Sequence, residues 1–153
     1  MTISLDFNCK YMKQYLFLIS ALLLTVSAAA PKNNGALPQY DAVLSFNSMC
    51  CGPPTNDFLK SFLTQFNKAN KVKVKARLLG GCGKEGEYVI VLSFAGLTAK
   101  TKPKLTAQLN ALVSKQNTAN RAANNVSGNI DIQYNVPPNQ LAGCRIPVTD
   151  WKY

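Results

Sequence analysis

The chain of 153 residues contains no histidine, one tryptophan and only seven acidic residues. Histidine is the commonest general base near neutral pH and the commonest metal ligand in proteins. Its absence excludes serine–histidine and cysteine–histidine catalysis, and it also excludes every histidine-ligated zinc site. Because no other arrangement of catalytic residue types is recognisable, we interpret the protein as non-catalytic.

Long apolar runs are missing except for one near the N-terminus. Lys10 and Lys13 precede the mostly apolar run 15–26, and small residues follow at 27–30. A basic region, a short apolar core and small residues are typical of a secretory signal peptide. The run is shorter than the roughly 20 residues that a membrane-spanning helix needs.

These features predict three segments. We expect a signal peptide over residues 1–29, a flexible linker over 30–39 and a single domain over 40–153. Either Met1 or Met12 can be the start, because the segment from Met12 already suffices as a leader. The protein is then secreted or periplasmic, with no transmembrane segment after signal cleavage, since no other run approaches spanning length.

Acidic residues are scarce relative to basic ones. Seventeen lysines and arginines against seven aspartates and glutamates give a net charge of +10. A basic exported protein is attracted to anionic surfaces such as lipid headgroups, acidic polysaccharides and extracellular nucleic acid. We therefore expect either a protein partner or an anionic polymer as the ligand. Export argues against intracellular nucleic acid, and so does the lack of interleaved aromatic residues of the RNA-binding kind.

The spacing of apolar residues beyond the linker predicts six regular elements. Strands are expected where apolar residues alternate or run continuously, and helices where they recur every three to four residues. The predicted order is strand, helix, strand, strand, helix, strand. These elements occupy residues 40–47, 55–70, 71–79, 87–94, 101 onward and 129–136.

This order predicts a ferredoxin-like α+β sandwich with an added C-terminal tail. Right-handed crossovers give a four-stranded antiparallel sheet in the order 4-1-3-2, with both helices on one face. The composition agrees. Strands 40–47 and 87–94 are apolar on both faces, as central strands are, whereas 71–79 and 129–136 alternate like edge strands.

The second predicted strand carries a basic surface on one side. Such charges also suit a sheet edge, where they discourage pairing with another chain. The basic surface consists of Lys71, Lys73, Lys75 and Arg77.

An apolar strip is expected beside these charges, on the sheet face without helices, formed by Val43, Val89 and Val91. The strip is either an interaction surface or is covered by the tail. The apolar tail residues that would cover it are Ile146, Val148 and Trp151.

The chain contains five cysteines. Cys9 lies in the predicted leader, which leaves Cys50, Cys51, Cys82 and Cys144. An even number of cysteines in an exported domain predicts structural disulfides. A bond between the adjacent Cys50 and Cys51 would close a strained small ring, so we set it aside. Two pairings remain: Cys50–Cys82 with Cys51–Cys144, or Cys51–Cys82 with Cys50–Cys144.

The predicted fold is compatible with both pairings. The turn after the first strand and the hairpin at Cys82 lie at the same end of the sheet. Residues 137–143 are just long enough for the tail to return along a strand to that end. Disulfides therefore explain all four cysteines, and the first hypothesis is an exported, disulfide-stabilised binding protein of unknown ligand with no cofactor.

Soft-metal binding is the alternative explanation of the same turn. Met49, Cys50 and Cys51 follow the first strand, and Cys82 can add a third thiolate. Thiolates suit Cu(I), Hg(II) or Zn(II). Met49-Cys50-Cys51 resembles the Met-x-Cys-x-x-Cys motif that heavy-metal-associated domains, which are ferredoxin-like, carry in this loop. The cysteines here are adjacent, whereas the motif separates them by two residues. The resemblance implies a periplasmic metal carrier.

Overall fold

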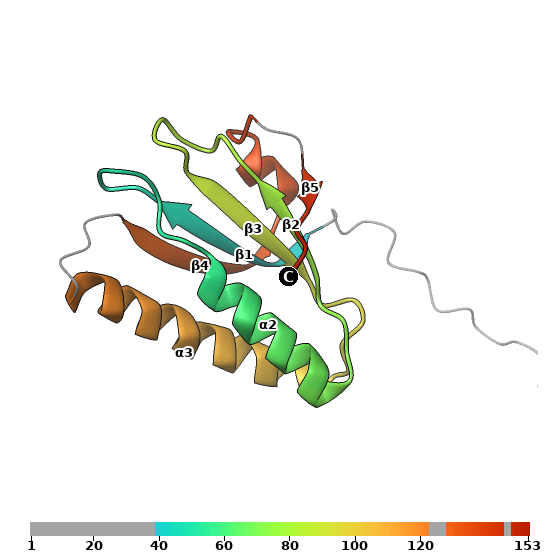
Figure 1. The fold of residues 1–153 in the computed structure, drawn as a ribbon. Coiled ribbons are helices and arrows are strands. Elements are labelled where there is room, and N and C mark those ends of the chain that lie inside the picture. The colour runs from blue at the N-terminus through green and yellow to red at the C-terminus, as the bar shows by residue number, and fades with distance from the viewer. Residues whose placement is uncertain (1–38, 123–127, 146–147) are drawn as a thin grey trace, which may run out of the picture. The chain divides into compact units, whose positions relative to one another are not determined.

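The computed structural model describes residues 39–122, 128–145 and 148–153 (Figure 1). The predicted signal peptide, and all of the predicted linker except Gln39, lie outside these residues. The elements are β1 (Tyr40–Asn47), α2 (Asp57–Asn70), β2 (Lys75–Leu79), β3 (Tyr88–Ser93), α3 (Thr101–Ala122), β4 (Asn129–Val136), the 3-10 helix η1 (Pro138–Leu141) and β5 (Thr149–Asp150).

Five strands of the described chain form one antiparallel sheet in the order β4-β1-β3-β2-β5. The α+β class and the order of the first four strands are confirmed. The prediction of four strands is wrong, because the tail returns and adds β5 to the outer edge of β2. In that pairing Thr149 lies opposite Leu78 and Asp150 lies opposite Arg77.

Both helices pack on one face of the sheet, as Figure 1 shows, and the main core lies between them and the sheet. Leu44 of β1 and Ile90 of β3 are fully buried against Leu59 and Leu63 of α2 and Leu105 of α3. Burying one such side chain stabilises the fold by roughly 1.5–3 kcal/mol. None of the helices in the described part of the chain combines the length and apolar character needed to cross a membrane.

The second strand is shorter than predicted, covering 75–79 instead of 71–79. Lys71 adopts a left-handed conformation (φ 52°) and ends α2, with its N–H bonded to the Asn67 carbonyl. The Asn67 side chain then accepts a hydrogen bond from the Val74 N–H at 3.1 Å. The alternating pattern begins at Lys71, but residues 71–74 cap the C-terminus of α2 and connect it to β2. Local helix capping determines the backbone conformation there, so the strand begins only at Lys75.

The sheet face opposite the helices carries a second, smaller cluster of buried residues. Leu141 of η1 and the half-buried Cys144 of the tail pack on it. Of the two alternatives left open for this face, an interaction surface or a cover by the tail, the structure shows the cover. The buried residues of the cluster are Val43, Leu79, Val89, Val91 and Val136.

The residues that form this cover differ from those predicted. Trp151 packs with the main core on the helix side of the sheet. Val148 is 43% exposed, and Ile146 lies outside the described residues. The prediction failed because η1, which places Leu141 over the valines, has no periodic pattern in the sequence.

The glycine that leads into β4 yields a stability prediction. Gly128 has a φ of 133°, and a Cβ at this position would overlap the backbone carbonyl of Asn47. We expect Gly128→Ala to lower the free energy of unfolding by about 2–4 kcal/mol, measured by urea denaturation. Gly143→Ala is the matched control, because a Cβ there meets no atom within 4 Å. Equal losses in both variants would contradict this account of the β1–β4 contact.

Candidate functional site

One disulfide joins the β2–β3 hairpin to the tail, between Cys82 and Cys144. Neither predicted pairing occurs: Cys82 bonds to Cys144, and Cys50 and Cys51 are both free. The sheet itself explains the difference. Cys82 and Cys144 pack on the face opposite the helices, whereas the chain after β1 turns toward α2 on the other face (Figure 1).

The free cysteines lie in an exposed turn between β1 and α2. Their sulfurs are 3.0 Å apart, with the Cys51 thiol donating to Cys50. The contact with Cys51 raises the pKa of the Cys50 thiol, and desolvation and the nearby Glu85 act in the same direction. A raised pKa lowers the fraction of Cys50 that is present as thiolate at neutral pH.

Side-chain hydrogen bonds fix both ends of this turn. Ser48 donates to the Glu85 carboxylate of the hairpin at 2.6 Å. The Tyr88 hydroxyl of β3 donates to the Pro54 carbonyl at 2.8 Å and accepts from Asn56 at 3.2 Å. The predicted proximity of the turn to the hairpin is therefore confirmed, but the contact runs through Glu85.

The residues predicted as metal ligands are not brought together as a set. Cys82 is held in the disulfide, and Met49 is 74% exposed. No group of three or more potential cysteine, aspartate or glutamate ligands occurs within residues 39–122, 128–145 and 148–153. Only Cys50 and Cys51 of the predicted ligand set remain adjacent.

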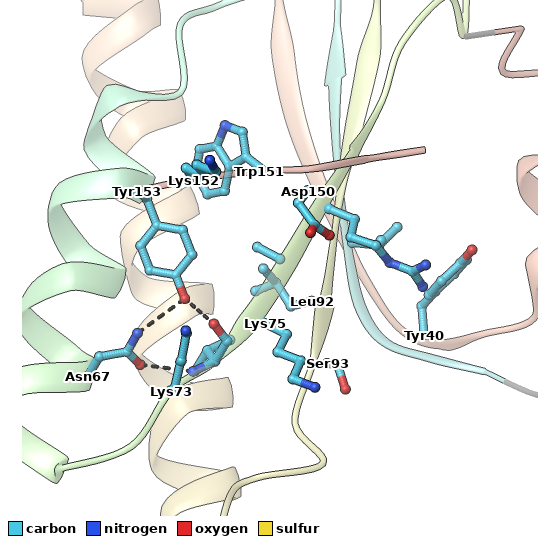
Figure 2. Close-up of a pocket in the computed structure, with 14 residues that line it drawn as sticks. Tyr40, Asn67, Lys73, Lys75, Leu92, Ser93, Asp150, Trp151, Lys152 and Tyr153 are labelled. Carbon is cyan, nitrogen blue, oxygen red and sulfur yellow. Dashed lines mark hydrogen bonds between the residues drawn. The ribbon is translucent and has the colours of Figure 1, made fainter. Parts of the chain in front are cut away.

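The basic surface lines a cavity of about 890 Å³ between β2 and the end of the tail (Figure 2). Lys73, Lys75 and Arg77 contribute to its wall, and the tail adds Lys152. We call these four residues and the cavity they line the basic groove. Lys71 is not part of it, because Lys71 ends α2.

The cations of the basic groove have no ionic partner among the described residues, whose one ion pair is Lys60–Asp57. Asp150 also lines the groove, but it forms no ion pair with Arg77 opposite it. The Arg77 guanidinium instead lies over the Tyr40 ring, 5.8 Å from its centroid. An anion entering the groove would meet several uncompensated positive charges.

The tail wall of the groove is fixed by hydrogen bonds to the chain around β2. The Trp151 N–H donates to the Ala76 carbonyl at 3.1 Å. The Tyr153 hydroxyl donates to the Val74 carbonyl and accepts from the Asn67 side chain, as the dashed lines in Figure 2 show. Partial burial raises the pKa of Tyr153 from its ordinary value of 10.0, and the hydrogen bond with Asn67 acts in the opposite direction.

Comparison of the chain with protein-family models, curated proteins and solved structures finds no match. The resemblance of Met49-Cys50-Cys51 to heavy-metal-associated domains therefore stays a hypothesis. The contribution of Lys152 and Trp151 to the groove was missed from the sequence, because β5 has only two residues and no alternating pattern.

Removing the disulfide should destabilise the protein strongly. Cys82 and Cys144 are 62 residues apart in sequence. The loop-closure model predicts that Cys82→Ser with Cys144→Ser lowers the free energy of unfolding by about 4 kcal/mol. Cys50→Ser with Cys51→Ser is the matched control and should change it by less than about 1 kcal/mol, because any loop it could open is minimal. Urea denaturation measures both, and comparable losses would refute the observed pairing.

Tyr88 should make the turn sensitive to alkaline pH. Burial raises the pKa of Tyr88 to about 12 from an ordinary value of 10.0, with Asn56 acting in the opposite direction. The unfolded chain therefore loses this proton first, and stability falls as the pH rises from 10 toward 12.

Tyr88→Phe should flatten this alkaline loss and cost about 1 kcal/mol at neutral pH through the lost hydrogen bond. Urea denaturation at several pH values measures both effects. Tyr40→Phe is the control, because the Tyr40 hydroxyl bonds no described residue. An alkaline loss in Tyr88→Phe as steep as in the wild type would contradict the assignment.

Proposed function

We propose that the protein is an exported, disulfide-stabilised binding protein whose ligand is an anionic polymer held in the basic groove. One observation supports this above the others: Lys73, Lys75, Arg77 and Lys152 share one cavity, and no described residue pairs ionically with them. Asp150 is the acidic residue in the lining of the groove, and it forms no ion pair with these cations.

The spacing of the cations favours a polymer. Lys75 and Arg77 are two residues apart on β2, so their side chains leave the same face about 7 Å apart. Lys73 continues the row at the same sequence spacing, and Lys152 flanks it from the tail. A chain with regularly repeated anionic groups can engage such a row at several points at once.

A protein partner is less well supported. The apolar strip that would have served it, Val43, Val89 and Val91, is at most 5% exposed because the tail covers it. The exposed side chains along the β2 edge of the sheet are mainly cationic, namely Lys73, Lys75 and Arg77.

The proposal extends to the fold family and the location. The strand order and the placement of both helices on one face support a ferredoxin-like domain to which β5 is an addition. The leader-like N-terminal sequence supports secretion or a periplasmic location, where the Cys82–Cys144 bond would persist.

A soft-metal carrier is the second candidate, and the two free thiols at 3.0 Å favour it. The predicted metal site lacks its third thiolate, because Cys82 is bonded to Cys144. Two thiolates on one tetrahedral ion, with metal–sulfur bonds of about 2.3 Å, would also have to lie about 3.8 Å apart. The turn would have to open to bind such an ion.

Neutralising the groove should weaken polyanion binding. The test variant is Lys73→Gln, Lys75→Gln, Arg77→Gln, and the probe is dextran sulfate. Three lost charges at about 0.5–1 kcal/mol each lower the affinity tenfold or more. Trp151 lines the groove and is the only tryptophan, so its fluorescence reports binding. Binding to the wild type should weaken as salt is added.

The matched control removes the same charge elsewhere, through Lys100→Gln, Lys102→Gln and Lys115→Gln. These lysines are exposed and do not line the groove. The control should change the affinity less than threefold. Equal weakening in both triple variants, or a Trp151 emission that dextran sulfate leaves unchanged, would refute the groove as the binding site.

A further inference from the structure

Cys50 and Cys51 are the free cysteines of the described chain, and their sulfurs already nearly meet. The separation is 3.0 Å. A disulfide requires the sulfurs to approach by about 1 Å, to a bond length near 2.05 Å. A tetrahedral metal would require them to separate by about 0.8 Å. The observed spacing lies between the two.

The backbone of the turn brings the two side chains to the same side. In an extended strand, adjacent side chains point to opposite faces, and neighbouring sulfurs cannot meet. Cys51 instead has a φ of 70° and Gly52 a φ of 94°, and both residues lie outside the helices and strands. Closing a ring here breaks no ladder hydrogen bond. The positive φ of the non-glycine Cys51 is an uncommon, strained backbone conformation of the kind that clusters at functional sites.

We propose that Cys50 and Cys51 form a reversible redox site, which closes to a vicinal disulfide in addition to the Cys82–Cys144 crosslink. The modified residues, Cys50 and Cys51, both lie in the exposed turn between β1 and α2. Forming a bond between them leaves the fold and the basic groove intact, so the redox proposal is independent of the proposed polymer binding.

The oxidant is a small-molecule disulfide of the glutathione class. The thiolate of the exposed Cys51 attacks one of its sulfurs, which breaks that S–S bond, releases one thiol and leaves a mixed disulfide on Cys51. The Cys50 thiolate then attacks the Cys51 sulfur, forms the Cys50–Cys51 bond and releases the second thiol. Two protons and two electrons pass from the protein to the oxidant, which ends as two thiols.

The vicinal bond should be reduced before the crosslink. Exposed and strained disulfides are the more easily reduced ones. Cys51 is exposed, whereas Cys82 and Cys144 are half-buried against the valine cluster. Closure and opening would change the conformation of the turn that carries the exposed Met49.

A redox titration tests the proposal. The full chain is equilibrated in buffers of oxidised and reduced glutathione and alkylated, and its peptides are weighed. At the oxidising end we expect the peptide holding Cys50 and Cys51 to be unlabelled and two hydrogens lighter than the dithiol. As the ratio becomes more reducing, both residues should gain labels together while Cys82 and Cys144 stay unlabelled.

The matched control is Cys51→Ser, which leaves Cys50 without a neighbour. It should carry a glutathione adduct on Cys50 at the oxidising end and show no ring closure. Three results would overturn the proposal: alkylated Cys50 and Cys51 at the oxidising end, stable glutathione adducts on both in the wild type, or linkage of either residue to a different peptide.

Discussion

The crosslink between Cys82 and Cys144 is the constraint on which the arrangement of the tail depends. It holds the returning tail against the sheet face that has no helices, so that Leu141 covers the valine cluster. From that anchor the chain reaches the edge of β2, where it adds β5 and contributes Trp151 and Lys152 to the lining of the basic groove. The bond thus anchors the cover of the second face, and hydrogen bonds around β2 then fix the tail wall of the basic groove.

Most of the fold is predictable from the sequence, because its signals are local and periodic. Apolar runs at 40–47 and 87–94 identify the central strands, and the alternation at 129–136 identifies an edge. The tail is not predictable in this way. Its cover comes from a four-residue 3-10 helix and a two-residue strand, and neither is long enough to show a period.

The cysteine pairing shows a different limit of sequence analysis. The prediction placed the turn after β1 and the hairpin at one end of the sheet, and the Ser48–Glu85 bond agrees with this. It did not consider on which face each thiol lies. Cys82 and Cys144 share the face opposite the helices, while the chain from β1 must pass to α2. The side of the sheet, and not the distance along the chain, decides which cysteines can meet.

The central claim is that Cys82 bonds to Cys144 and thereby holds the tail in place. The most direct test is to digest the unreduced protein with a protease and identify the linked peptides by mass spectrometry. The account predicts that the peptide containing Cys82 is joined to the peptide containing Cys144. A link from either of these cysteines to Cys50 or Cys51 would contradict it.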